Sequence, residues 1–163
     1  MNRKQLFVVI MLVISLFAAV TAVAAEGNSD LAKVRASTAR FHRPEAAQAA
    51  GWDLRAGLDF CFDNPGVGGM GYHYISSVDA TVNELEPEAM VYAPGPNGNL
   101  QLAAVEYIVD KIQWDFDNPG VLPQALGQEF HALNSELYVL HAWIWMNNPS
   151  GMFEDWNPNV SCS

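Results

Sequence analysis

Residues 102–109 have the sequence Leu-Ala-Ala-Val-Glu-Tyr-Ile-Val and contain neither glycine nor proline. A run rich in β-branched and aromatic residues predicts a β-strand. Apolar side chains occupy both odd and even positions, so we expect both faces of this strand to be buried. The charged residue of the run, Glu106, is then expected to lie inside the protein.

Three other segments of similar composition predict further strands: residues 70–75, 89–93 and 137–146. Residues 94–99, Pro-Gly-Pro-Asn-Gly-Asn, separate the second of these from residues 102–109. Such a sequence is typical of a hairpin turn. Because strands joined by a hairpin run antiparallel, the sequence predicts an antiparallel sheet.

Two short helices are predicted before the strands. Residues 31–41 carry apolar side chains at helical spacing, with Asp30 as a candidate cap, and residues 44–51 begin with proline and end with glycine. Helices followed by strands are typical of the α+β class. We therefore expect short N-terminal helices packed on an antiparallel β-sheet; the alternative is a small β-barrel with a helical cap.

Two glycine-containing patterns are interpreted as backbone features. Residues 66–71 match the G-x-G-x-x-G pattern of dinucleotide-binding proteins, but they lead into the strand-like residues 72–74, which predicts a tightly turned strand entry. The hexapeptide Phe-Asp-Asn-Pro-Gly-Val occurs at residues 62–67 and again at residues 116–121. Asn-Pro-Gly favours a turn, so we interpret the repeat as one turn used twice; the alternative is an ancient duplication.

The charge distribution makes a buried Glu106 unusual. The chain has 8 Lys and Arg against 18 Asp and Glu. Residues 56–163 contain a single fixed cation, Lys111. A buried carboxylate without a partner is costly, so Glu106 needs a cation, a hydrogen-bond partner or a bound proton.

Histidines near the predicted strands are candidates for that partner. His73 lies in residues 70–75, His141 lies in residues 137–146, and His131 precedes the latter. Imidazoles and a carboxylate on adjacent strands are suitable ligands for a divalent transition metal such as Zn, Cu, Fe or Mn. The candidate metal ligands are therefore His73, Glu106 and His141, with His131 as an optional fourth; the alternative is a buried polar network without metal.

Four aromatic residues flank the strand histidines: Tyr72, Tyr74, Trp143 and Trp145. They are candidates for the lining of a ligand pocket, although large aromatic residues on strands also commonly form core. Standard catalytic motifs are absent from the sequence. We therefore expect a protein that binds a metal ion or small ligand; the alternatives are a metal-dependent enzyme using the same residues and a structural or interaction module with a buried polar network.

Residues 1–25 have the features of a secretory signal peptide. Arg3 and Lys4 precede an apolar run over residues 6–20, and small residues follow. Cleavage would leave residues 26–163 as a single globular domain, secreted or periplasmic, without a membrane segment. The alternative is a leader retained as a membrane anchor.

Export also determines how the cysteines are interpreted. Cys61 and Cys162 are the two cysteines of the chain, and an even number in an oxidising compartment predicts one disulfide. The bridge would close a loop of about 100 residues, which contributes about 4–5 kcal/mol in the chain-entropy model.

The net charge argues against several classes of partner. It is −10 for the whole chain, and removal of the two basic residues of the leader makes it −12. Nucleic acids and anionic membranes require cationic surfaces, so neither is expected as a partner. Hydrophobic residues make up 50% of the chain, which favours a packed domain over a disordered one. A small molecule or a metal ion is the expected partner, and the sequence does not point to a protein partner.

Five motifs occur together along the chain: Gly-Met-Gly-Tyr-His-Tyr (69–74), Val-Glu-Tyr (105–107), Leu-His-Ala-Trp-Ile-Trp (140–145), Asn-Pro-Ser-Gly-Met-Phe (148–153) and Trp-Asn-Pro-Asn-Val-Ser-Cys (156–162). As a set they resemble a family of small exported bacterial proteins without an assigned activity. The resemblance spans nearly the whole mature chain, and its tail motif is the most specific part. It implies bacterial export and a single domain, and it assigns no cofactor or catalytic role.

Overall fold

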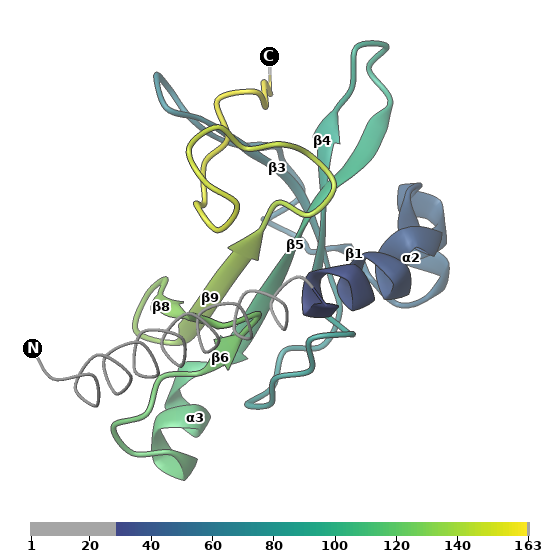
Figure 1. Cartoon of the computed structure of the whole chain (residues 1–163). Coiled ribbons are helices and arrows are strands. Elements are labelled where there is room, and N and C mark those ends of the chain that lie inside the picture. The colour runs from purple at the N-terminus through teal and green to yellow at the C-terminus, as the bar shows by residue number, and fades with distance from the viewer. Residues whose placement is uncertain (1–28, 163) are drawn as a thin grey trace, which may run out of the picture.

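A computed structural model describes residues 29–162 of the chain (Figure 1). The expected signal peptide, residues 1–25, lies outside the described residues. Short N-terminal helices are followed by a seven-stranded antiparallel sheet, so the predicted α+β class is confirmed. The alternative of a small barrel is wrong, because the sheet of the described residues is open, with β1 at one edge and β8 at the other.

Four long strands form the middle of the sheet in the order β3-β4-β5-β9, and all their pairings are antiparallel. They correspond to the four strands predicted from sequence, and the predicted turn at residues 94–99 joins β4 to β5. These strands are β3 (Gly68–Ile75), β4 (Ala89–Pro94), β5 (Leu100–Asp110) and β9 (Leu137–Ala142).

Short strands complete the sheet at its edges. Strand β1 (Asp53–Leu54) and strand β2 (Phe62–Asn64) both pair with β3, and β8 (His131–Ala132) pairs with β9. Strands β6 (Gln124–Ala125) and β7 (Gln128–Glu129) form a separate two-stranded ladder.

The last predicted strand is shorter than expected. Residues 137–146 were expected to be extended throughout, but β9 ends at Ala142. Beyond it the backbone amide of Trp143 donates to the Met152 carbonyl, so the chain has left the regular ladder.

The helices lie close to their predicted positions. Residues 29–38 are helical, and they continue into the 3₁₀ turn η1 (Ala39–Phe41) and then into α2 (Pro44–Ala49). Asp30 lies inside the first helix, where its carboxylate accepts a hydrogen bond from the side chain of Lys33. The prediction that Asp30 caps this helix is therefore wrong. Helix α3 (Lys111–Asp117) was not expected from the sequence. Among the described residues, none of the helices combines the length and the apolar character needed to cross a bilayer.

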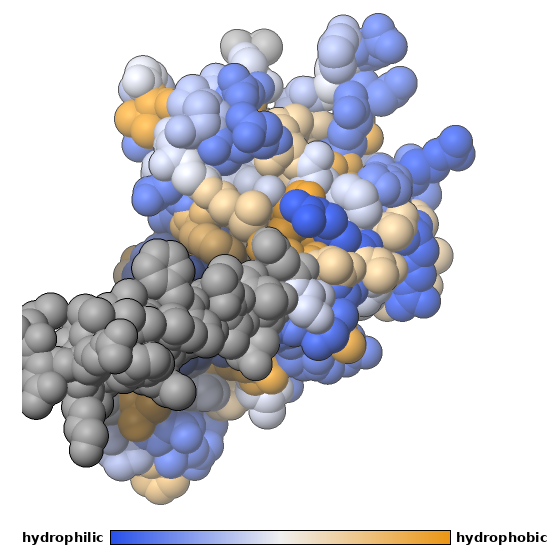
Figure 2. All heavy atoms as spheres, in the orientation of Figure 1, coloured by the Kyte–Doolittle hydropathy of each residue, from blue (hydrophilic) through white to orange (hydrophobic). Residues whose placement is uncertain are grey.

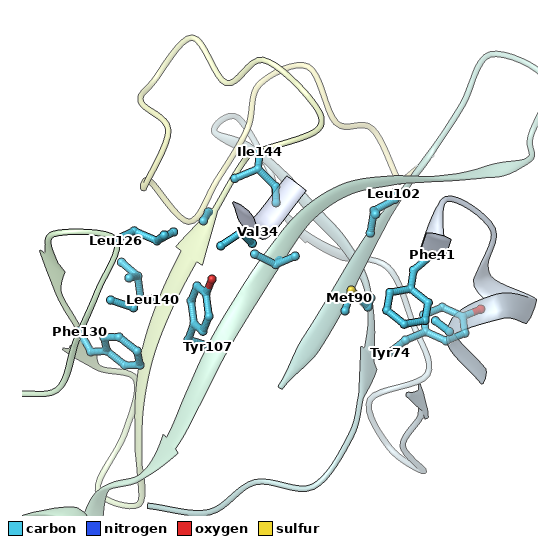
Figure 3. Packing of buried hydrophobic residues seen from close by; sticks show 14 of the residues in the cluster. Val34, Phe41, Tyr74, Met90, Leu102, Tyr107, Leu126, Phe130, Leu140 and Ile144 are labelled. Carbon is cyan, nitrogen blue, oxygen red and sulfur yellow. The ribbon is translucent and has the colours of Figure 1, made fainter. Parts of the chain in front are cut away.

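The main hydrophobic core lies between the N-terminal helices and one face of the sheet (Figure 3). Helix residues Val34 and Phe41 pack with Tyr74, Met90 and other residues of the central strands. The buried hydroxyl of Tyr92 donates to the carbonyl of Phe41 at 2.6 Å, which ties the helical segment to the sheet.

The C-terminal segment packs against the other face of the sheet. Val160 contacts a cluster that includes Val91, Ala104 and Trp143. A side chain at Gly68 would overlap the carbonyl of Asn157, so glycine permits this close approach. Figure 1 shows the segment in yellow beside β3.

On the face shown in Figure 2, hydrophilic residues surround a smaller group of apolar ones.

The two cysteines form the predicted disulfide, with Cα atoms 5.6 Å apart. It fastens the end of the chain to the residue that precedes β2.

Candidate functional site

The sheet register brings three of the predicted site residues onto one face. Glu106 of β5 pairs with His141 of β9 and with Ala89 of β4, while His73 of β3 pairs with Val91 of β4. Residues that pair across strands share a face, as do residues two apart on one strand. His73, Glu106 and His141 therefore lie on the face that the C-terminal segment covers. We call them the buried cluster.

The buried cluster is shielded from solvent. His73 and Glu106 are each 6% exposed and His141 is 0% exposed. Nε2 of His73 lies 3.4 Å from Oε2 of Glu106, and the centroids of the two imidazole rings are 6.1 Å apart. Glu106 thus lies inside the protein with a histidine beside it, as the strand pattern indicates.

Burial controls the protonation of these groups. Burial raises the pKa of Glu106 to about 8, and the nearby negative charges of Asp155 and Glu88 add to this rise. Burial also lowers the pKa of His73 to about 4 and holds the pKa of His141 well below its usual range. At pH 7, without a bound cation, the cluster is therefore a protonated acid beside neutral imidazoles.

Three of the four imidazole nitrogens of the cluster lack a hydrogen-bond partner among the described residues. In the part of the chain that the structure describes, Nδ1 and Nε2 of His141 and Nδ1 of His73 make no hydrogen bond. The rings have aromatic neighbours, because Phe62 packs edge-on against His73 at 5.1 Å and Trp143 lies 4.6 Å from His141. A buried polar group without a partner costs about 1–3 kcal/mol, so an electrophile or proton donor at this place would be stabilising.

Neutral imidazole nitrogens and a carboxylate are the donors that transition metals prefer. As the side chains stand, residues 29–162 contain no group of three or more His, Cys, Asp and Glu positioned to hold a metal ion. The metal-ligand role of His73, Glu106 and His141 stays a prediction.

His131, the optional fourth ligand, lies on the same face at the sheet edge. It pairs with Val139, two residues before His141 on β9. Its Nε2 is 3.3 Å from Oδ2 of Asp155, a residue of the C-terminal segment, and its side chain is 49% exposed. Sequence reasoning missed Asp155.

The four aromatic residues expected to line one pocket lie on two faces of the sheet. Tyr72, Tyr74 and Trp145 pack with the main core, whereas Trp143 belongs to the cluster on the opposite face. Tyr74 also borders a surface hollow of about 900 Å³ beside α2. Of the four, Trp143 is the one that contacts the buried cluster.

Glu88 is a second buried acid that the sequence analysis missed. Its side chain accepts a hydrogen bond from the backbone amide of Ile108 at 2.9 Å. Burial raises the pKa of Glu88 to about 7. Its position directly before the apolar run 89–93 was the available signal.

Comparison of the chain with protein-family models, with curated proteins and with solved structures gave no match. The resemblance to a family of small exported bacterial proteins therefore stays a prediction. The functional argument depends on the geometry of the site.

Proposed function

We propose that the protein binds one divalent transition metal ion at the buried cluster of His73, Glu106 and His141. The observation that carries this proposal is the fully buried His141, whose two ring nitrogens have no partner in the described chain although Glu106 lies opposite on the neighbouring strand. A fully buried imidazole normally satisfies at least one nitrogen.

The chemistry of the cluster suits an ion of this class. Neutral imidazole is the form that binds a metal, and burial holds both His73 and His141 in that form. The carboxyl of Glu106 would release its proton on binding and supply a negative charge to the cation. Ala89 and Val91 of β4 pair with Glu106 and His73. Their side chains have no metal-binding atoms, so the ligands would come from the three cluster residues.

We also propose that the protein works outside the cytoplasm, in the periplasm or as a secreted protein. The disulfide supports an oxidising compartment. The sequence of residues 1–25 supports export.

Thermal unfolding with added metal tests the proposed site. A ligand that binds the native state alone raises its stability by about 2.7 kcal/mol at a concentration 100 times its Kd. We expect Zn²⁺, Cu²⁺, Fe²⁺ or Mn²⁺ to raise the melting temperature of the wild-type protein. His141→Gln and Glu106→Gln should each abolish most of this increase, because each removes one ligand.

His42→Gln is the matched control, because His42 is exposed and lies outside the cluster. It should respond to metal as the wild type does. Protein purified from its native host should contain one equivalent of metal by elemental analysis. If none of the four ions changes the melting temperature and no metal is found, the cluster is a structural polar network and the proposal is wrong.

A further inference from the structure

The buried cluster needs a route by which an ion can reach it. Its three residues are at most 6% exposed, so a hydrated cation cannot meet them directly. Two groups that can bind a metal lie at the sheet edge beside β9: His131, which is exposed, and Asp155, which is partly buried.

The placement of His131 follows from the register. His131 pairs with Val139, and Val139 pairs with Ile108. The next pair of β5 and β9 on the same face is Glu106 with His141. The side chain of His131 therefore stands on the face that carries the cluster, one strand further out. Figure 1 shows β8 beside β9 at this edge.

Asp155 is held over this edge by its neighbours in sequence. Nε1 of Trp143 donates to the carbonyl of Glu154 at 2.6 Å, and the side chain of Asn148 donates to the carbonyls of Glu154 and Trp156. These bonds hold the backbone on both sides of Asp155. Its Oδ2 contacts His131, while its Oδ1 is buried and has no partner among the described residues.

Asp155 also interacts electrostatically with the buried cluster. Its charge is close enough to Glu106 to add to the effect of burial on that side chain. One oxygen of Asp155 thus contacts a half-exposed histidine, and the same group interacts electrostatically with the innermost acid of the cluster.

We propose that His131 and Asp155, the outer pair, form an entry site that captures a divalent transition metal ion from solvent and delivers it to the buried cluster. This inference rests on the proposed function. An imidazole nitrogen and a carboxylate oxygen 3.3 Å apart can both contact one ion with small side-chain movements, since each metal bond is about 2.0–2.2 Å long. The ion exchanges water for these two ligands, and no covalent bond of the protein changes.

Stopped-flow mixing of the full mature protein with Zn²⁺ and a competing indicator dye tests the entry role. Charge beside a binding site typically accelerates capture of an oppositely charged ligand by tenfold or more. We expect Asp155→Asn and His131→Gln each to lower the association rate constant about tenfold, with a smaller change in Kd. Glu129→Gln is the matched control, because Glu129 is an exposed acid near His131 that contacts the side chain of Gln124.

The outcomes separate the two proposals. If the wild type binds Zn²⁺ through the cluster but both outer-pair variants bind it at the wild-type rate, the entry site is wrong and the proposed function stands. If the variants lose affinity and keep the wild-type association rate, Asp155 or His131 is a permanent ligand and the entry role is also wrong. If the wild type does not bind Zn²⁺, both proposals fail. Unchanged melting temperatures of the metal-free variants show that each remains folded.

Discussion

Replacement of Glu106 by glutamine should make the metal-free protein more stable at neutral pH. Glu106 is 6% exposed, and burial raises the pKa of its carboxyl group from 4.5 to about 8. Glutamine has nearly the same shape as the protonated acid and cannot ionise. The variant should therefore keep the packing of the buried cluster and lose its dependence on a bound proton.

The sign follows from proton linkage. A group whose pKa is higher in the folded state contributes stability that is fully present below the unfolded pKa and is lost as the pH rises through the folded pKa. For Glu106 the loss begins near pH 4.5 and ends above about pH 8. At pH 7 the loss covers two and a half pH units, which corresponds to about 3 kcal/mol. Glu106→Gln should match the wild type at pH 4 and exceed it by up to this amount at pH 7.

Urea unfolding with a chelator present, repeated between pH 4 and pH 8, measures this difference. His73 and Glu88 also have shifted pKa values and both interact with Glu106. The difference between the two curves therefore reports Glu106 together with its interaction with these two groups. Glu129→Gln is the matched control, because it replaces an exposed carboxyl group outside the buried cluster. A difference between Glu106→Gln and wild type that does not change with pH would refute the argument that burial controls this carboxyl group.

Two further predictions concern the backbone. Reduction of the disulfide should lower the free energy of unfolding by about 4–5 kcal/mol, because it frees a loop of 101 residues, and equal urea midpoints with and without reductant would contradict this. Gly71→Ala should cost at least about 3 kcal/mol, because Gly71 has a φ of 106° and a Cβ there would overlap the Tyr92 carbonyl. Gly66→Ala, with a φ of 85° and open space around it, should cost only about 1 kcal/mol, and equal losses of melting temperature would disprove the overlap argument.

The central strands were predictable because burial on both faces leaves a clear pattern in the sequence. Residues 102–109 are all buried, by the helices on one face and by the C-terminal segment on the other. Helix α3 was not predictable in the same way. None of its residues is buried, so no apolar stripe marks it, and Phe116 is 81% exposed.

The repeated hexapeptide separates local from tertiary effects. In both copies the valine amide donates to the asparagine carbonyl three residues earlier, and the glycine has a positive φ. The residues before the turn differ, because residues 62–64 form β2 and residues 116–117 end α3. The turn chemistry is therefore local, as expected, whereas the flanking structure depends on what each copy packs against.

The same distinction explains which site residues could be found. Glu106 and His141 were recognisable because each is a polar residue that interrupts an apolar strand. Asp155 lies in a segment rich in Asn and Pro, where an acid is ordinary, and only the tertiary fold brings it to His131. The residues that cover the buried cluster are distant from it in sequence. Phe62 comes before the cluster residues and Asp155 comes after them, and the disulfide joins the two segments that contain these residues. A variant that loosens this cover should therefore expose the cluster without altering the strands that carry it.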